Sequence, residues 1–188
     1  MAIVLIGIGL AACDSGSGSP SSSAGVPHPA PPPEEAKIPS GWRVVLNASI
    51  PDPTADGGIN VSRLEAGAEG NATDRFDNGL DIRAMLSGSL QVYFDHRRDA
   101  DYGPFSKQVW NDIRSTDLPQ EWALEVAAGS GVTVTLQWTL PDGEVGCGTN
   151  RFILEDPTGA LPQTDLCDVQ SLRYTGDGLV KQFSLRVI

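Results

Sequence analysis

Strict alternation of apolar and polar residues is the feature that most constrains the fold of this chain. In the stretch "GVTVTLQWTL", residues 131–140, apolar side chains at Val132, Val134, Leu136, Trp138 and Leu140 alternate with threonine and glutamine. A period of two places the apolar side chains on one face of a strand, as in a sheet with one buried face. The stretch is therefore predicted to be a strand of an antiparallel sheet.

The same period recurs along most of the chain beyond residue 40. Long segments with this pattern are residues 42–50, 121–126 and 181–188, and shorter ones are residues 90–95, 150–156 and 171–175. No stretch shows a long 3.6-residue period, and turn-forming residues separate the segments. We therefore expect an all-β fold, an antiparallel β-sandwich that is Ig/fibronectin-like or jelly-roll-like. Within it we expect a meander with tight turns at Asp142-Gly143 and at Pro157 to Gly159.

The N-terminal segment is continuously apolar and does not alternate. Residues 2–12 form an apolar run that is shorter than the roughly 20 residues of a membrane-spanning helix but suits the h-region of a secretory signal. The run ends in "LAAC" (Leu10 to Cys13), which resembles the lipobox of bacterial lipoproteins. The resemblance implies cleavage before Cys13 and lipidation of its thiol, and more than one acyl chain gives stable anchoring. The alternative is an ordinary signal peptide, or an N-terminal helix, with a chance cysteine.

A signal peptide needs a positive n-region, and no Lys or Arg precedes this apolar run. We therefore expect the true start to lie upstream of Met1. Residues 13–40 begin with Ser and Gly and continue into "PHPAPPP", which is typical of a flexible coil followed by a stiffer polyproline spacer. The expected organisation is a signal peptide at residues 1–12, a lipid-anchored linker at residues 13–40 and a β-sandwich domain at residues 41–188.

Charge and cysteine usage fit a domain outside the cytoplasm. The net charge of −11 makes nucleic acid and anionic lipid headgroups poor partners. Cys147 and Cys167 remain once Cys13 is assigned to the anchor, and export permits a disulfide between them. The lipoprotein resemblance implies a location in the cell envelope, on a bacterial membrane that the sequence does not identify.

Eight short pieces between residues 41 and 188 also resemble, in order, a module found in large secreted bacterial proteins. The pieces are "GWRVVL", "ATDRFDNGLDI", "VYFDH", "NDIRS", "EWALEV", "VTLQWTL", "ILEDPTG" and "FSLRV". Arg75 and Asp95 stand where the pattern has glycine and proline, and the cysteine pair is not part of the pattern. The family has no assigned activity, so the resemblance implies a fold and an extracellular setting.

One loop carries three carboxylates that suggest a cofactor. Asp74, Asp77 and Asp81 lie within "ATDRFDNGLD", and carboxylate oxygens are the ligands that Ca²⁺ prefers. The alternative is turn chemistry, in which Asp and Asn bond their own backbone and Gly79 supplies a positive φ. Calcium is the one cofactor that the sequence suggests.

Catalytic residues are not indicated. His96 lies in the polar run "DHRRDADYG", which is interpreted as a surface loop, and no nucleophile, metal or phosphate motif accompanies it. The sequence therefore predicts a non-catalytic, membrane-anchored module that binds or scaffolds an envelope protein or polysaccharide.

Two other functions stay open. A carbohydrate-binding accessory lipoprotein requires exposed aromatic side chains among Tyr93, Tyr102, Phe105 and Trp110, for which core packing is the competing interpretation. An envelope hydrolase requires a Ser, Thr or Asp oxygen within about 3 Å of the His96 ring.

Overall fold

Residues 41–188 are the ones that the computed structural model describes. The predicted signal peptide (1–12), the lipidation of Cys13 and the linker up to residue 40 lie outside them. The described part of the chain is all-β, with eleven strands in one mixed sheet and two short 3-10 segments, η1 (Asp56–Gly58) and η2 (Gly143–Val145).

Seven strands lie where the alternating pattern predicts them. In β1 every second side chain from Trp42 to Ile50 is buried, as the pattern requires. The confirmed strands are β1 (Trp42–Pro51), β4 (Leu90–Asp95), β6 (Gln120–Ala128), β7 (Thr133–Thr139), β8 (Phe152–Glu155), β10 (Ser171–Thr175) and β11 (Val180–Val187).

The strands that the pattern does not predict are β2 (Ile59–Ala68), β3 (Ile82–Arg83), β5 (Gln108–Arg114) and β9 (Thr164–Asp165). In β2 the inward positions beyond Leu64 are the small residues Ala66 and Ala68, which give a weak apolar signal. In β5 a charged side chain, Asp112, is completely buried beside Ile113, so polar residues interrupt the alternation.

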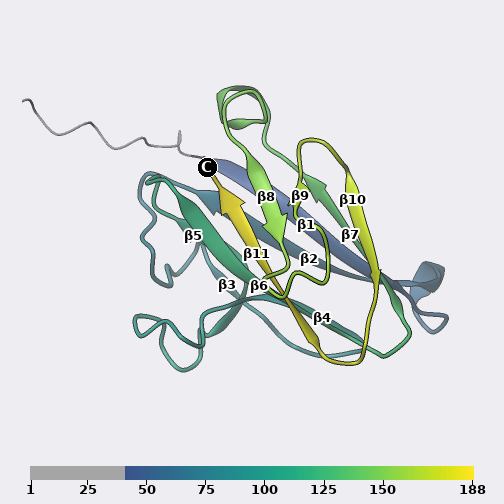
Figure 1. Ribbon diagram of the computed structural model, residues 1–188. Coiled ribbons are helices and arrows are strands. Elements are labelled where there is room, and N and C mark those ends of the chain that lie inside the picture. The colour runs from purple at the N-terminus through teal and green to yellow at the C-terminus, as the bar shows by residue number, and fades with distance from the viewer. Residues whose placement is uncertain (1–40) are drawn as a thin grey trace, which may run out of the picture. The chain divides into compact units, whose positions relative to one another are not determined.

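The sheet runs in the order β10-β7-β1-β2-β5-β4-β6-β11-β8-β9, with β3 paired to β5. Neighbours are antiparallel except β2 and β5, which are parallel. The strip folds back on itself, so that β10-β7-β1-β2 faces β4-β6-β11-β8 (Figure 1). The sandwich-like prediction is confirmed, with one parallel pair in an otherwise antiparallel arrangement.

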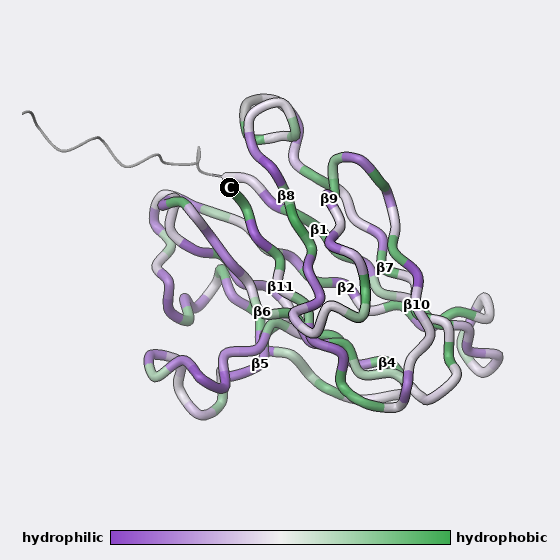
Figure 2. Tube along the Cα trace, in the orientation of Figure 1, coloured by the Kyte–Doolittle hydropathy of each residue, from purple (hydrophilic) through white to green (hydrophobic). Residues whose placement is uncertain are grey.

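The core lies between these two layers. The Trp42 ring of β1 meets Trp122 of β6 and Phe152 of β8 edge-on, with centroid distances of 6.2 and 6.1 Å. Such edge-to-face pairs add about 0.5–1.5 kcal/mol to the burial of the rings. Figure 2 shows hydrophobic residues on strands such as β8 and β11, with hydrophilic residues prominent in the loops.

The predicted meander is only half formed. A tight turn is present at Pro157 to Gly159, where Gly159 has a φ of 72° and its N–H donates to Asp156 O, and it leads from β8 into its partner β9. A turn is also present at Gly143, which has a φ of 73° and begins η2. The predicted meander is wrong there, because β7 pairs with β1 and β10 whereas β8 pairs with β11 and β9. The chain leaves one layer after β7 and enters the other at β8.

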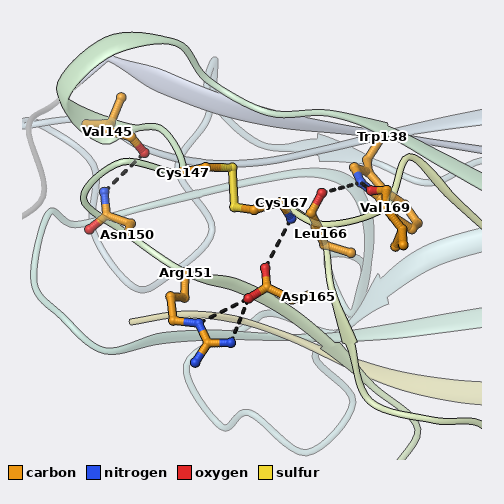
Figure 3. Close-up of a disulfide and its surroundings, with 9 residues drawn as sticks. All are labelled: Trp138, Val145, Cys147, Asn150, Arg151, Asp165, Leu166, Cys167 and Val169. Carbon is orange, nitrogen blue, oxygen red and sulfur yellow. Dashed lines mark hydrogen bonds and ion pairs between the residues drawn. A yellow bond between two sulfur atoms is a disulfide. The ribbon is translucent and has the colours of Figure 1, made fainter.

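The predicted disulfide is present between Cys147 and Cys167 (Figure 3). It joins the crossing segment after β7 to the short connection between β9 and β10. Trp138 Nε1 holds the same connection by donating to Leu166 O and Val169 O, both at 2.9 Å. The connection is therefore fixed by a covalent bond and by two hydrogen bonds from β7.

Candidate functional site

Three directly opposed side chains form a polar row on the outer face of β4, β6 and β11. The register places Tyr93 opposite Glu125, and Glu125 opposite Gln182. Tyr93 Oη donates to Glu125 Oε2 at 2.5 Å, and Gln182 Nε2 donates to Glu125 Oε1 at 2.9 Å. Glu125 lies on the outer face of the sheet, yet it is only 2% exposed, because the side chains that donate to its carboxylate cover it.

The loop that follows β4 completes this row. Arg97 donates to both Glu125 and Asp95, which joins the β4–β5 loop (residues 96–107) to β6. Burial and the hydrogen bond to Glu125 raise the pKa of Tyr93 to about 12, so the phenol stays protonated as a donor. Because Glu125 receives bonds from the loop and from both neighbouring strands, it fixes the start of the loop against the sheet.

His96 points from the same loop in the opposite direction, into a buried cluster. Its Nδ1 donates to Asp99 Oδ2 at 2.6 Å and its Nε2 donates to Asp112 Oδ2 at 2.9 Å. The ring stacks on Tyr102 with a centroid distance of 3.7 Å and an interplanar angle of 3°. Burial opposes protonation of His96, but the two carboxylates outweigh it and raise its pKa. Both ring nitrogens face carboxylate oxygens, an arrangement that favours the imidazolium form.

Asp112 is the centre of this cluster. Its carboxylate is 0% exposed and accepts hydrogen bonds from His96, from Tyr102 Oη at 3.3 Å and from Arg114 Nη2 at 2.8 Å. Burial alone would raise the pKa of Asp112, but His96 and Arg114 lower it below the usual value. The Arg114 guanidinium also lies over the Trp122 ring, 5.1 Å from its centroid. Two cations therefore compensate one fully buried carboxylate.

The interpretation of the His96 segment as a surface loop is wrong for the imidazole itself, which is 2% exposed. The hydrolase hypothesis requires an Asp oxygen about 3 Å from the ring, and two are present. Both ring nitrogens are engaged, however, so no lone pair is left to accept a proton from a nucleophile. The geometry describes a cross-link between the loop and β5 rather than a general base.

The three carboxylates proposed for calcium bond different backbone groups instead of converging. Asp77 accepts from Thr73 N at 2.6 Å, and Asp81 accepts from Asp77 N at 2.7 Å and from Ile113 N at 2.8 Å. Asp74 accepts from Ser115 N at 3.2 Å and from the Ser115 hydroxyl at 2.9 Å. Among residues 41–188 no group of three His, Cys, Asp or Glu side chains is placed to hold a metal ion. Gly79 has a φ of 96°. The geometry follows the turn-chemistry alternative: Asp77 bonds within the loop, whereas Asp81 and Asp74 fasten the loop to Ile113 of β5 and to Ser115 after it.

The aromatic platform for sugar is not formed by the predicted residues. Tyr93 and Tyr102 are 4% and 3% exposed, and Trp110 is half-buried against the core. Phe105 is 81% exposed and stands on the β4–β5 loop without these three beside it on the surface. Trp110 thus packs against the core, and the two tyrosines are buried in the polar networks around Glu125 and Asp112.

A cleft of about 480 Å³ opens between the β4–β5 loop and the outer face of β6 and β11. Its floor carries Glu121, Ala123 and Glu125 of β6 with Gln182 and Ser184 of β11, and its sides carry Asp95, Arg98, Asp99, Arg114 and Pro157. Glu121 accepts a hydrogen bond from Ser184 Oγ at 2.5 Å and remains exposed. The cleft therefore presents polar groups that the two buried networks hold in fixed positions.

Sequence reasoning does not find Asp112, Arg114, Glu125 or Gln182 as partners. Glu125 shares the phase of Glu121 in β6, which predicts an exposed side chain, and only the register with β4 and β11 reveals its donors. The sequence feature that could have pointed to Asp112 is the "NDIR" piece, in which a carboxylate stands next to an apolar strand residue.

In the part of the chain that the structure describes, no helix has the length and apolar character needed to cross a membrane. In comparisons with protein-family models, with curated proteins and with solved structures, no match was found.

Proposed function

We propose that this chain is a membrane-anchored, non-catalytic binding protein of the cell envelope, which offers the cleft beside the β4–β5 loop to a partner. The lipobox-like "LAAC" and the spacer up to residue 40 support the anchor. The observation that carries the binding role is the cleft itself, whose polar lining is held in place on both sides by buried hydrogen bonds. Preorganised polar groups in a concave site are what ligand recognition requires.

The charges of the cleft favour a partner that presents a cationic group. Its lining holds four carboxylates and two guanidiniums, Arg98 and Arg114. Asp95 and Glu125 are paired with Arg97, and Asp99 with His96, so Glu121 is the lining carboxylate that no described cation pairs. Arg114 is already paired with Asp112, and the whole chain carries a net charge of −11. A lysine or arginine side chain of an envelope protein therefore meets an attractive field here.

Glu121→Gln is expected to weaken the binding of a tetralysine peptide to the full chain in detergent micelles. The amide keeps the shape of the side chain and removes one exposed carboxylate that no cation neutralises in the described structure. An exposed charge contact is worth roughly 0.4–1 kcal/mol, so the dissociation constant should rise about two- to fivefold. Isothermal titration calorimetry at low and at moderate salt measures this change.

Asp56→Asn is the matched control, because it removes the same charge from an exposed residue in η1, outside the cleft lining. The affinity of this variant should equal that of the wild type. Equal weakening by both variants would mean that the peptide senses only the net charge, and the absence of binding by the wild type would reject the cationic partner.

A further inference from the structure

The two ends of the sheet leave an open seam. β9 and β10 are the terminal strands of the strand order, and they do not pair with each other although only residues 166–170 connect them. Two adjoining cavities of about 340 and 330 Å³ lie along this seam. Residues from the range 160–165 line one side of these cavities, and residues from the range 171–177 line the other side. We call this feature the seam groove.

Backbone hydrogen-bonding groups of β10 face the seam groove. Gly176 N donates to Val132 O at 2.8 Å, which shows that Gly176 directs its amide toward the β7 side. In an antiparallel pair this direction alternates from residue to residue, so Tyr174 and Leu172 also bond β7. Ser171, Arg173 and Thr175 consequently direct their N–H and C=O groups to the free edge.

The side chains along the groove define two different walls. Tyr174 points inward, and the centroid of its ring lies 5.7 Å from that of Phe183. The cavity of about 330 Å³ beside it is also lined by apolar side chains, those of Val126, Ala128, Leu161 and Leu179. Leu179 is 72% exposed. Arg173 is exposed on the edge and forms no ion pair with another described residue. The groove thus combines unpaired backbone, an apolar pocket and the unpaired cation of Arg173, with the carboxylates of Asp168 and Asp177 elsewhere in its lining.

One end of the seam groove is held open by the bonds of Figure 3. The disulfide at Cys167 and the Trp138 hydrogen bonds fix the connection between the two strands. Asp165 of β9 is held by Arg151, whose Nη2 donates to it at 2.7 Å. Because these contacts fix β9 and the connection independently of β10, the two strand edges stay apart.

We propose that the seam groove binds an extended peptide segment of a partner protein, which adds as a strand to β10. Strand addition satisfies the free edge with main-chain hydrogen bonds, and alternate side chains supply specificity. Apolar peptide residues enter the pocket beside Tyr174 and Leu179, and an acidic residue lies next to Arg173. This inference is independent of the cleft on β6 and β11.

Two other occupants fit less well. Residues 14–40 of the same chain are rich in proline, which has no N–H to donate to a strand ladder. A second copy could pair its own β10 with this one in an antiparallel arrangement centred on Arg173. The two Arg173 side chains would then lie directly opposite each other, and like charges in that position are destabilising. A partner peptide with a carboxylate avoids both problems.

The test uses the acetylated, amidated peptide Thr-Val-Glu-Val-Thr and the full chain in detergent micelles. Arg173→Pro removes an edge-directed N–H without touching the β7 ladder, and Thr175→Pro does the same at the second edge position. We expect either proline variant to weaken peptide binding about tenfold or more, and Arg173→Gln to weaken it about two- to fivefold. Peptide binding to the wild type should slow amide hydrogen exchange at Arg173 and Thr175.

Unfolding curves identify which proline variant remains folded. Asp56→Asn changes an exposed residue outside the lining of both cavities, so it should bind the peptide as the wild type does. Unchanged affinity in a folded proline variant would overturn the proposal. So would the absence of wild-type binding at millimolar peptide, or exchange protection on another edge. A concentration-dependent dimer that excludes the peptide would assign the groove to a second copy instead.

Discussion

Asp112→Ala is expected to lower the free energy of unfolding by about 3–5 kcal/mol, because it removes one partner of a buried ion pair and leaves the other behind. His96 and Arg114 both point at this carboxylate, and Tyr102 adds a third hydrogen bond. Without Asp112 the His96 ring, which is 2% exposed, and the largely buried Arg114 guanidinium lose the carboxylate that they share. Urea unfolding of the full chain, followed by tryptophan fluorescence, measures the difference.

Asp99→Ala is the control for this prediction. Asp99 also accepts a hydrogen bond from His96, but its side chain is 51% exposed, so water can replace it. Exposed pairs contribute about 0–1 kcal/mol, and the cost of Asp99→Ala should stay in that range. Equal losses in the two variants would contradict the view that burial of Asp112 dominates the cluster.

Replacing Cys147 and Cys167 together by serine is expected to cost about 3 kcal/mol, because the bond closes a loop between residues separated by 20 positions. In the reduced chain the crossing segment after β7 and the β9–β10 connection can separate in the unfolded state. Unfolding of the double variant and of the wild type, with and without dithiothreitol, measures the loss.

Reductant should destabilise the wild type to the level of the double variant and leave the double variant unchanged. A wild type that is indifferent to reductant would mean that the two thiols are not joined in solution. Arg151→Ala provides a comparison, because it removes the neighbouring ion pair with Asp165 but keeps the covalent bond. This exposed pair should contribute no more than about 1 kcal/mol.

The fold was predictable wherever one strand face consists of large apolar side chains. β1, β7 and β11 have such faces, and each lies where the alternation places it. β5 was not predictable, because it buries Asp112, a charge whose partners come from a loop and from its own strand. The crossing after β7 was missed for a related reason. The Asp-Gly pair predicts a turn, but the layer that the next strand joins depends on contacts with residues distant in sequence.

The candidate site was less predictable than the fold. The polar run around His96 is visible in the sequence, but the direction of each side chain is not. Asp95 and Arg97 lie on the side of Glu125, whereas His96 and Asp99 lie on the side of Asp112. This division depends on the neighbouring strands. Asp77 and Asp81 attract attention as carboxylates, yet the same oxygens that suit a cation also suit backbone N–H groups. The use of Asp81 was decided by the approach of Ile113, which no local pattern encodes, whereas Asp77 bonds Thr73 only four residues away.

The central claim is that this all-β domain acts at a membrane to which its own N-terminus is attached. The most direct test is intact-mass spectrometry of the full chain recovered from the membrane fraction of a bacterial host, with Cys13→Ser in parallel. The account predicts a chain that begins at Cys13 and carries diacylglycerol, and a Cys13→Ser protein that lacks this lipid. An uncut chain that retains residues 1–12 and has a free Cys13 thiol would contradict it.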